Sequence, residues 1–189
     1  AWQFYSYISM FLGAIEAVIM PIFSEELSRN LEMAKKILAR MTKYITWLGL
    51  AAVGATWIFV PKLLELLFGL RYLPSVPLIL YAVIALPVDA MAVVFRPALF
   101  ALHAQKALLK ITLYMLLTNV LAAILTYFYG AWGFILTMPL GSGLSLYLRR
   151  KYTIKEKPEL AFGVNSIFSW DLYDHELLGR IWRRISGRY

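Results

Sequence analysis

The sequence predicts an all-α protein, a bundle of helices that crosses a membrane several times, and three observations lead to this fold class. Hydrophobic residues make up 61% of the chain, whereas a soluble domain contains about 45–50%, and the mean hydropathy is +0.66. These residues form long blocks that approach or exceed the roughly 20 residues that a helix needs to cross a bilayer. Most lysines and arginines lie between and after the blocks, as in a polytopic membrane protein.

The composition also excludes several kinds of site. The chain has no cysteine, which removes disulfides, thiolate metal sites and cysteine nucleophiles. Its histidines, His103 and His175, are far apart and have no metal-ligand spacing around them. There is no Gly-rich phosphate loop and no convincing Ser-His-Asp pattern. We therefore expect neither an enzyme nor a cofactor, and membrane topology explains the net charge of +8 better than a nucleic-acid partner does.

Five apolar blocks are candidate spans. Their predicted bounds are residues 2–23, 45–69, 76–102, 108–129 and 132–148. Pro61 lies inside the second block, and Pro87 and Pro97 lie inside the third, where neighbouring helices can satisfy the freed backbone groups. The short "YGAWG" turn between the last two blocks predicts an antiparallel helical hairpin. The odd number of blocks and the lack of an initiator methionine suggest a piece of a longer protein or a processed product.

Lysine and arginine predict the orientation of these spans. If all five blocks cross, the first connection, the third connection and the end of the last block lie on the same side. The basic residues at these places are Arg29, Lys35, Lys36, Arg40, Lys43, Lys106, Lys110, Arg149, Arg150 and Lys151. The other side carries Arg71, with Lys62 near it. We therefore expect a multi-pass protein of the cytoplasmic membrane, with its amino end outside and its carboxyl end in the cytoplasm.

Two parts of the chain are predicted outside the spans. Within a helical lobe of residues 1–154, residues 24–44 form a predicted amphipathic cytoplasmic loop, in which Ser24 could cap a helix on the inner leaflet, in contact with membrane lipids. Its apolar face consists of Leu27, Leu31, Ala34, Leu38 and Met41. The alternative is a solvated basic helix. Residues 155–189 form a predicted basic cytoplasmic tail, which either binds anionic headgroups through an amphipathic segment or is loosely ordered.

Three ionisable residues lie well inside the predicted spans, namely Glu16, Asp89 and Arg96. An ionised side chain at the centre of a membrane helix costs about 2.5–3.5 kcal/mol, so such residues are candidates for function. Asp89 and Arg96 are separated by about two helical turns, which places them within roughly 20° on one face and about 10.5 Å apart along the axis. They form a polar stripe that we expect to face a cavity. Glu16 lies at a depth similar to that of Arg96, which permits an ion pair in at least one conformation.

Structural roles remain open for these and other polar residues. Arg96 could extend to the inner headgroups, and Glu16 could be protonated and bond a neighbouring helix. Asn119, in the middle of the fourth block, lies on a transport pathway or, as is more common for such residues, bonds between helices. Ser142 and Ser145 lie among glycines and predict close helix packing.

Four segments resemble motifs of the polysaccharide and lipid-linked oligosaccharide flippases, in the multidrug/oligosaccharidyl-lipid/polysaccharide exporter superfamily. "VIMPIFSEELSRN" resembles their span-ending Pro-x-x-Ser element, and "FVPKLLELLFGLRYLPSVPLILYAV" resembles their "P-x-x-(I/L)-(I/L)-x-L-x-F-G-x-x-Y" segment. "LFALHAQKALLKI" resembles an "L-x-A-x-G-K" hairpin, with Gln105 where glycine is common. "YGAWGFIL" resembles "YGxxGAAxA", with Phe134 and Ile135 where small residues are usual. The resemblance covers residues 4–148.

The resemblance implies a fold and a function. It implies that the chain is most of the carboxyl-terminal lobe of a two-lobed exporter, without its amino-terminal lobe. Such an exporter flips lipid-linked oligosaccharide or polysaccharide units across the cytoplasmic membrane by alternating access around a central cavity. A diphosphate headgroup needs a cation and an ion-coupled step needs a carboxylate, roles for which Arg96 and Asp89 are the candidates from the burial argument. Glu16 and Asn119 are further candidates on the substrate or ion pathway.

Three other functions compete with this one. A cation-coupled multidrug or small-molecule antiporter of the same superfamily would use Glu16 and Asp89 more than a cation. A non-transporting membrane scaffold would recruit partners through its basic surfaces, but the charges inside the spans argue against it. A membrane-bound glycosyltransferase would need a metal-binding or acidic catalytic cluster outside the membrane, and the sequence contains none.

Overall fold

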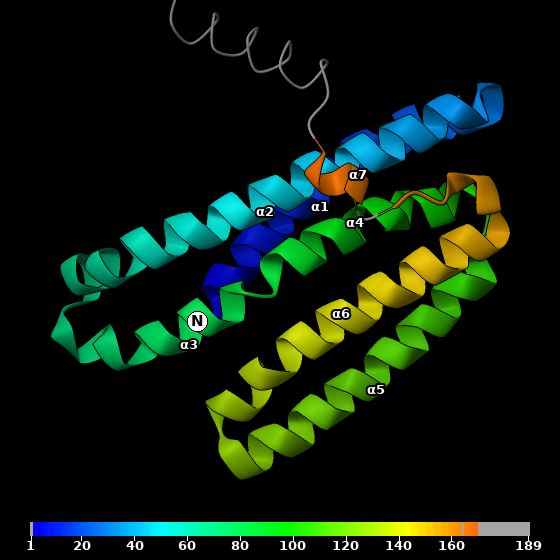
Figure 1. Cartoon of the computed structure of the whole chain (residues 1–189). Helices are drawn as coiled ribbons and strands as arrows, with labels where there is room; N and C mark the ends of the chain where they lie inside the picture. Colours follow the sequence, from blue (N-terminus) through cyan, green and yellow to red (C-terminus); the bar gives the residue numbers. More distant parts are fainter. Residues whose placement is uncertain (1, 164, 170–189) are drawn as a thin grey trace, which may run out of the picture.

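The computed structural model describes residues 2–163 and 165–169. Its elements are α1 (Trp2–Arg29), α2 (Leu31–Phe68), η1 (Leu70–Ser75), α3 (Val76–Val83), α4 (Leu86–Ala101), α5 (Gln105–Tyr129), α6 (Ala131–Glu156), η2 (Pro158–Leu160) and α7 (Asn165–Phe168). No strand occurs among the described residues, so the predicted all-α class is confirmed. The long helices run back and forth beside one another, and α3 and α4 together make one bent pass (Figure 1).

Several of these helices are long and apolar enough to cross a membrane, as in a multi-pass membrane protein. In the described part of the chain, α2, α5 and α6 meet this condition individually. The segments Leu70–Val83 and Leu86–Ala101 are bent by 42° and add a fourth candidate if they form one broken span. Residues 2–23 lie in α1, which is not among these candidates, so about five crossings stay a prediction.

The predicted loop 24–44 is not a separate element. Its first residues end α1, and its remainder begins α2, which continues without a break from Leu31 to Phe68. Ser24 caps no helix, because its hydroxyl donates to the Met20 carbonyl within α1 at 2.8 Å. Asn30 is the N-cap of α2 instead, and its side chain accepts a hydrogen bond from the Met33 amide at 3.1 Å. No proline follows until Pro61, which α2 accommodates.

The apolar face of this segment is covered by protein. Ala34 and Leu38 are buried in a cluster with Phe23 of α1, Phe95 of α4 and Leu160 of η2. The rest of the predicted face packs against the same cluster, namely Leu27, Leu31 and Met41. This face therefore contacts α1, α4 and η2, where the sequence pattern alone predicts contact with the inner leaflet.

Helix α4, which carries Asp89 and Arg96, is the central helix of the bundle. It packs against α1, α2 and α6, and to a smaller extent against α5. Its buried residues are Leu86, Ala90, Ala92, Val94, Phe95, Pro97, Ala98 and Leu99. Gly49 of α2 allows a close approach, because a Cβ there would lie 2.9 Å from the Cα of Pro87. Asp89 and Arg96 thus lie on a helix that has three close neighbours, although the Arg96 side chain itself is 50% exposed.

Glycines shape the turn between α5 and α6. Gly130 has a φ of +58°, a conformation that costs little only for glycine. A Cβ on Gly133 would lie 2.0 Å from the Leu125 carbonyl oxygen, so a side chain would prevent α6 from approaching α5 this closely. The hairpin predicted from "YGAWG" is confirmed by these two helices.

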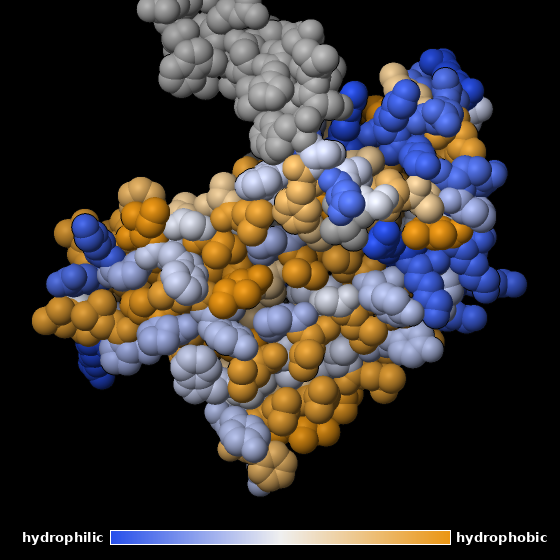
Figure 2. Space-filling view, viewed as in Figure 1, coloured by the Kyte–Doolittle hydropathy of each residue, from blue (hydrophilic) through white to orange (hydrophobic). Residues whose placement is uncertain are grey.

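The two ends of the bundle differ in polarity. The α1–α2 junction, the α4–α5 turn and the carboxyl end of α6 lie together at the right of Figure 1. Hydrophilic residues gather at this end in Figure 2, while the middle of the bundle is largely hydrophobic. The α2–η1 and α5–α6 turns lie at the opposite end. This is the segregation that the lysine and arginine pattern predicts, whereas the assignment of the basic end to the cytoplasm stays a prediction.

The segment after α6 folds back onto the bundle. We call residues 158–163 and 165–169 the carboxyl strap. Leu160 and Ile167 of the strap are buried, and the Phe162 ring stacks on Phe95 of α4 with centroids 6.0 Å apart. The Lys43 ammonium of α2 also donates to the Ser169 carbonyl. The part of the predicted tail that the structure describes is therefore packed against the lobe, and residues 170–189 lie outside the described residues.

Candidate functional site

Glu16 and Arg96 form an ion pair between α1 and α4. The Arg96 Nε lies 3.4 Å from Glu16 Oε1, and the side chains are 50% and 17% exposed, respectively. The Arg96 guanidinium also lies 6.0 Å from the ring centroid of Phe100, one turn further along α4. The pair that similar depth permits is therefore present in this conformation. The ion pair is accessible mainly from the side of Arg96, which is the more exposed partner.

Arg149 of α6 joins this pair, although the sequence pattern assigns it to the basic end of the last span. Its Nη1 donates to the Ala92 carbonyl at 2.9 Å, at a point on α4 between Asp89 and Arg96. Arg149 also interacts electrostatically with Arg96, Glu16 and Asp89. Its Nε is buried and has no hydrogen-bond partner among the described residues.

The sequence pattern does not identify Arg149 as a site residue, because α6 is longer than the apolar run that predicts it. The apolar run ends at Leu148, but the helix continues to Glu156, so Arg149 lies within it and faces α4. A helical period would have found it, because Ser142, Ser145 and Arg149 follow one another at steps of three and four residues. Residues at this spacing share one face of a helix, and here that face points at α4.

We call Glu16, Asp89, Arg96 and Arg149 the charge network. It contains two carboxylates and two guanidiniums, so its formal charge is balanced when all are ionised. Charges inside an apolar bundle persist where they are paired, because an isolated charge costs several kcal/mol. The network joins α1, α4 and α6, and a movement of any one of these helices would change its pairing.

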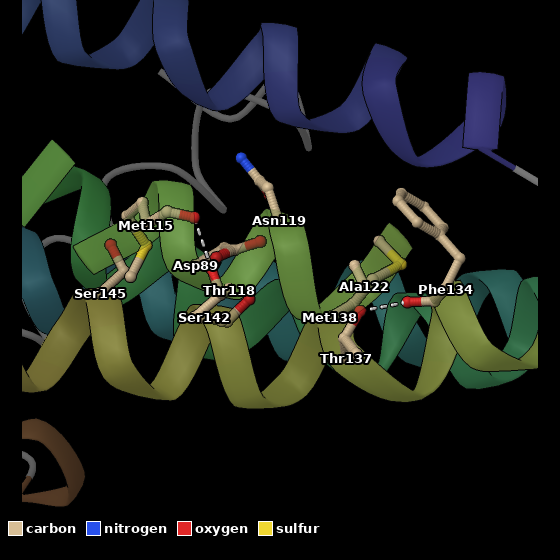
Figure 3. Close-up of a pocket in the computed structure, with 11 residues that line it drawn as sticks. Asp89, Met115, Thr118, Asn119, Ala122, Phe134, Thr137, Met138, Ser142 and Ser145 are labelled. Carbon is tan, nitrogen blue, oxygen red and sulfur yellow. Dashed lines mark hydrogen bonds between the residues drawn. The ribbon is translucent and has the colours of Figure 1, made fainter. Parts of the chain in front are cut away.

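Asp89 also lines a cavity of about 220 Å³ between α4, α5 and α6. We call this cavity the α4–α6 pocket. Its lining residues are Asp89, Met115, Thr118, Asn119, Ala122, Phe134, Thr137, Met138, Gly141, Ser142 and Ser145. Figure 3 shows the Asp89 carboxyl group between side chains of α5 and α6, with Ser142 beside it. The Ser142 side chain interacts with that carboxyl group.

The structure therefore divides the predicted site residues between two places. Asp89 and Asn119 meet in the α4–α6 pocket, whereas Arg96 and Glu16 meet beside α1. The predicted stripe on α4 does not face a single cavity, because its two ends contact different helices. Arg149 lies between these ends and connects them. Ser142 and Ser145 are buried, and they also line the pocket. The close helix packing predicted at their neighbouring glycines is not found, because a Cβ on Gly143 would meet no atom within 4 Å.

Comparison with known proteins identifies no relative. No described protein family, curated protein or solved structure matches this chain. The described residues also contain no group of three or more histidine, cysteine, aspartate or glutamate side chains that could hold a metal ion.

Proposed function

We propose that this chain is most of one lobe of a two-lobed exporter that flips lipid-linked oligosaccharide or polysaccharide units across the cytoplasmic membrane. The physical task is to carry a polar sugar-phosphate headgroup through a region that excludes it, while the prenyl chain stays in the lipid. A second lobe completes the cavity. The observation that carries this proposal is the charge network, a cluster of four ionisable side chains from α1, α4 and α6 within an apolar bundle.

The two guanidiniums of the network suit a phosphate-bearing substrate. Arginine presents several N–H donors in a planar fork that matches phosphate oxygens, and it stays charged in apolar surroundings. Arg96 is half exposed in the described lobe, and Arg149 has a buried Nε without a partner among the described residues. Arg96 therefore presents donors to an incoming anion, and the buried Nε of Arg149 would become a further donor if α1, α4 and α6 moved apart. Glu16 pairs with Arg96 and would compete with phosphate for it.

The arrangement of the helices is compatible with this role. The proposed topology has about five crossings, with α1 as the first and the bent α3–α4 pair as the third. The basic helix ends that lie together in Figure 1 would face the cytoplasm, with the carboxyl end on the same side. The half-exposed side of the Glu16–Arg96 pair would face the second lobe across the cavity.

A cation-coupled antiporter of the same superfamily is the second candidate. The observation in its favour is the α4–α6 pocket, in which Asp89 and several side-chain oxygens surround one cavity. Such an antiporter would need the carboxylates of the network and would gain nothing from its arginines. Substitution of the arginines therefore separates the two functions.

The decisive experiment compares Arg96→Gln with Lys110→Gln in the complete two-lobed protein, reconstituted in proteoliposomes with a fluorescent lipid-linked oligosaccharide. Lys110→Gln is a matched control, because it removes one positive charge from a residue that is not part of the charge network. Flipping per protein molecule should fall at least about tenfold in Arg96→Gln, the effect of losing one charged hydrogen bond to substrate, and should stay unchanged in Lys110→Gln. The double variant Glu16→Gln with Arg96→Gln removes both partners of the ion pair. A loss of flipping in this variant therefore cannot come from an unpaired glutamate and reports the lost contact with substrate. If both arginine variants flip the lipid at the parental rate, the proposal is wrong.

A further inference from the structure

The side chains of the α4–α6 pocket present hydrogen-bond acceptors. The Thr118 hydroxyl donates to the Met115 carbonyl at 2.8 Å, and the Thr137 hydroxyl donates to the Phe134 carbonyl at 2.6 Å. Both bonds are drawn in Figure 3. Because each hydroxyl hydrogen is used within its own helix, only the oxygen lone pairs remain for a ligand. These two threonines therefore accept from a ligand and do not donate to it.

Asp89 and Asn119 strengthen this character. An ionised carboxylate accepts hydrogen bonds and repels anions, and an asparagine amide supplies both an acceptor and donors. Asp89 and Asn119 both line the pocket. The charge of Asp89 is already opposed by Arg149, with which it interacts. The pocket thus suits a ligand that offers several donors without carrying negative charge, and it does not suit a phosphate.

The remaining lining is apolar, and the pocket is small. Phe134, Met115 and Met138 offer apolar surfaces, and an aromatic ring can contact the C–H face of a pyranose. The volume of about 220 Å³ is below the range of about 300–1,000 Å³ for drug-sized ligands. It equals the volume of roughly seven water molecules at about 30 Å³ each, so a bare ion would not fill it. A single sugar ring matches both the size and the mixture of acceptors and apolar surface.

We propose that the α4–α6 pocket binds one neutral sugar ring of the transported headgroup through the ring's hydroxyl donors, while the phosphate is held by Arg96 and Arg149. This inference rests on the proposed function, because it assigns a part of that substrate to the pocket. The division follows the chemistry of the two places, since the guanidiniums attract phosphate and the acceptors of the pocket attract hydroxyl groups. Arg149 lies between them and connects the sugar site to the phosphate site.

The test uses the whole chain in detergent micelles and saturation-transfer NMR with the methyl glycosides of glucose, galactose, mannose and N-acetylglucosamine. Thr118→Val keeps the shape of the side chain and removes the acceptor oxygen that lines the pocket. Thr112→Val is the matched control, because Thr112 makes the same kind of bond within α5, to the Leu108 carbonyl at 3.0 Å, and does not line the pocket. At least one glycoside should show saturation transfer. Its signal should fall about fivefold in Thr118→Val, as expected for one lost hydrogen bond, and stay unchanged in Thr112→Val.

Three outcomes would overturn the inference. The first is the absence of a signal from every glycoside, and the second is an equal loss in both threonine variants. The third is a cation site, shown if sodium chloride raises the melting temperature above that in choline chloride at equal ionic strength and Thr118→Val abolishes the difference. Flipping assays distinguish this failure from failure of the proposed function. Sugar binding that depends on Thr118 in a protein that flips no lipid would contradict the function alone, and normal flipping without sugar binding would contradict the inference alone.

Discussion

Arg149 and Arg150 are neighbours in the sequence, but they have different tasks in the structure. Arg149 donates to the Ala92 carbonyl and belongs to the charge network. Arg150 donates to the Phe162 carbonyl at 2.9 Å and holds the carboxyl strap. Both are partly buried side chains on α6. They allow an internal comparison between a residue for which we propose a contact with substrate and a residue that holds the strap.

We expect Arg149→Gln to reduce flipping by the complete transporter at least about tenfold per molecule, because a charged donor beside the substrate is lost. Arg150→Gln should leave flipping within about twofold. Measuring transport and protein level in the same proteoliposomes separates activity from folding. The assignment of Arg149 fails if the two variants have equal activity per molecule, since they remove the same charge one residue apart.

The residues that could be predicted from the sequence are those whose type contradicts their surroundings. Asp89 and Arg96 are conspicuous because their ionised forms are costly in an apolar block. Arg149 is not conspicuous, since it stands beside other basic residues at the end of such a block. Its role depends on the continuation of α6 and on the packing of that helix against α4, and neither can be deduced from local composition. Asn119 reaches the same pocket as Asp89 through long-range packing of α5 on α6, which the sequence pattern does not fix.

At the scale of the helices, some features could likewise be predicted from the sequence and others could not. The apolar blocks correspond to helices, and the "YGAWG" turn is a hairpin, because both depend on local composition and glycine. The predicted break between residues 24–44 and the second span is absent, because no proline interrupts α2 before Pro61 and its N-cap is Asn30. Amphipathic periodicity shows that a face will be buried, but not whether lipid or protein will cover it. In the case of α2, protein covers the face, and the covering elements are the carboxyl strap, α1 and α4.

The strap should depend on Leu160, which is 1% exposed in the same cluster as Leu38 of α2. We expect Leu160→Ala to cost about 2–5 kcal/mol of local stability, the usual effect of truncating a buried leucine. Hydrogen exchange of the strap amides and of the first turns of α2 should then become faster. Leu140→Ala is the control, because Leu140 is 63% exposed on α6 and should leave this exchange unchanged. Equal exchange in both variants would show that the strap is not held by Leu160.

The α5–α6 hairpin should depend on Gly133 and not on Gly143. A Cβ at Gly133 would overlap the Leu125 carbonyl, whereas a Cβ at Gly143 has no atom within 4 Å. Gly133→Ala should therefore destabilise the protein by about 1–3 kcal/mol, as overpacking does, and Gly143→Ala should have little effect. The fraction of monodisperse protein that survives a heat step, measured by size-exclusion chromatography, checks this. Survival of Gly133→Ala equal to that of Gly143→Ala would contradict the close approach of the two helices.

At the scale of the whole molecule, charged residues occupy particular positions along the length of the bundle. The basic helix ends lie at one end of the bundle, and Lys62 and Arg71 belong to the segment around the opposite α2–η1 turn. The charge network joins helices that run in the same direction, because α1, α4 and α6 all run towards the basic end while α2 and α5 return from it (Figure 1). A displacement of α1 relative to α4 would break the Glu16–Arg96 pair and leave Arg149 in contact with α4. Alternating access would require a rearrangement of this kind.

The proposed topology predicts which residues can be reached from each side of the membrane. The chain has no native cysteine, so single cysteines give an unambiguous signal. Cysteines at Ser28, beside the α1–α2 junction, and at Lys106, at the start of α5, should react with a membrane-impermeant maleimide only from the cytoplasmic side. A cysteine at Ser75, at the end of η1, should react only from outside. The physical reason is that α2 separates Ser28 from Ser75 by one apolar span, and that the broken α3–α4 span returns the chain to the side of Ser28.

Labelling in spheroplasts and in inverted vesicles, before and after detergent is added, measures the accessible fraction from each face. Reaction of Ser28 and Ser75 from the same face would exclude a crossing by α2. Reaction of Lys106 from the face of Ser75 would show that α3 and α4 form a re-entrant loop, and it would reduce the number of crossings accordingly.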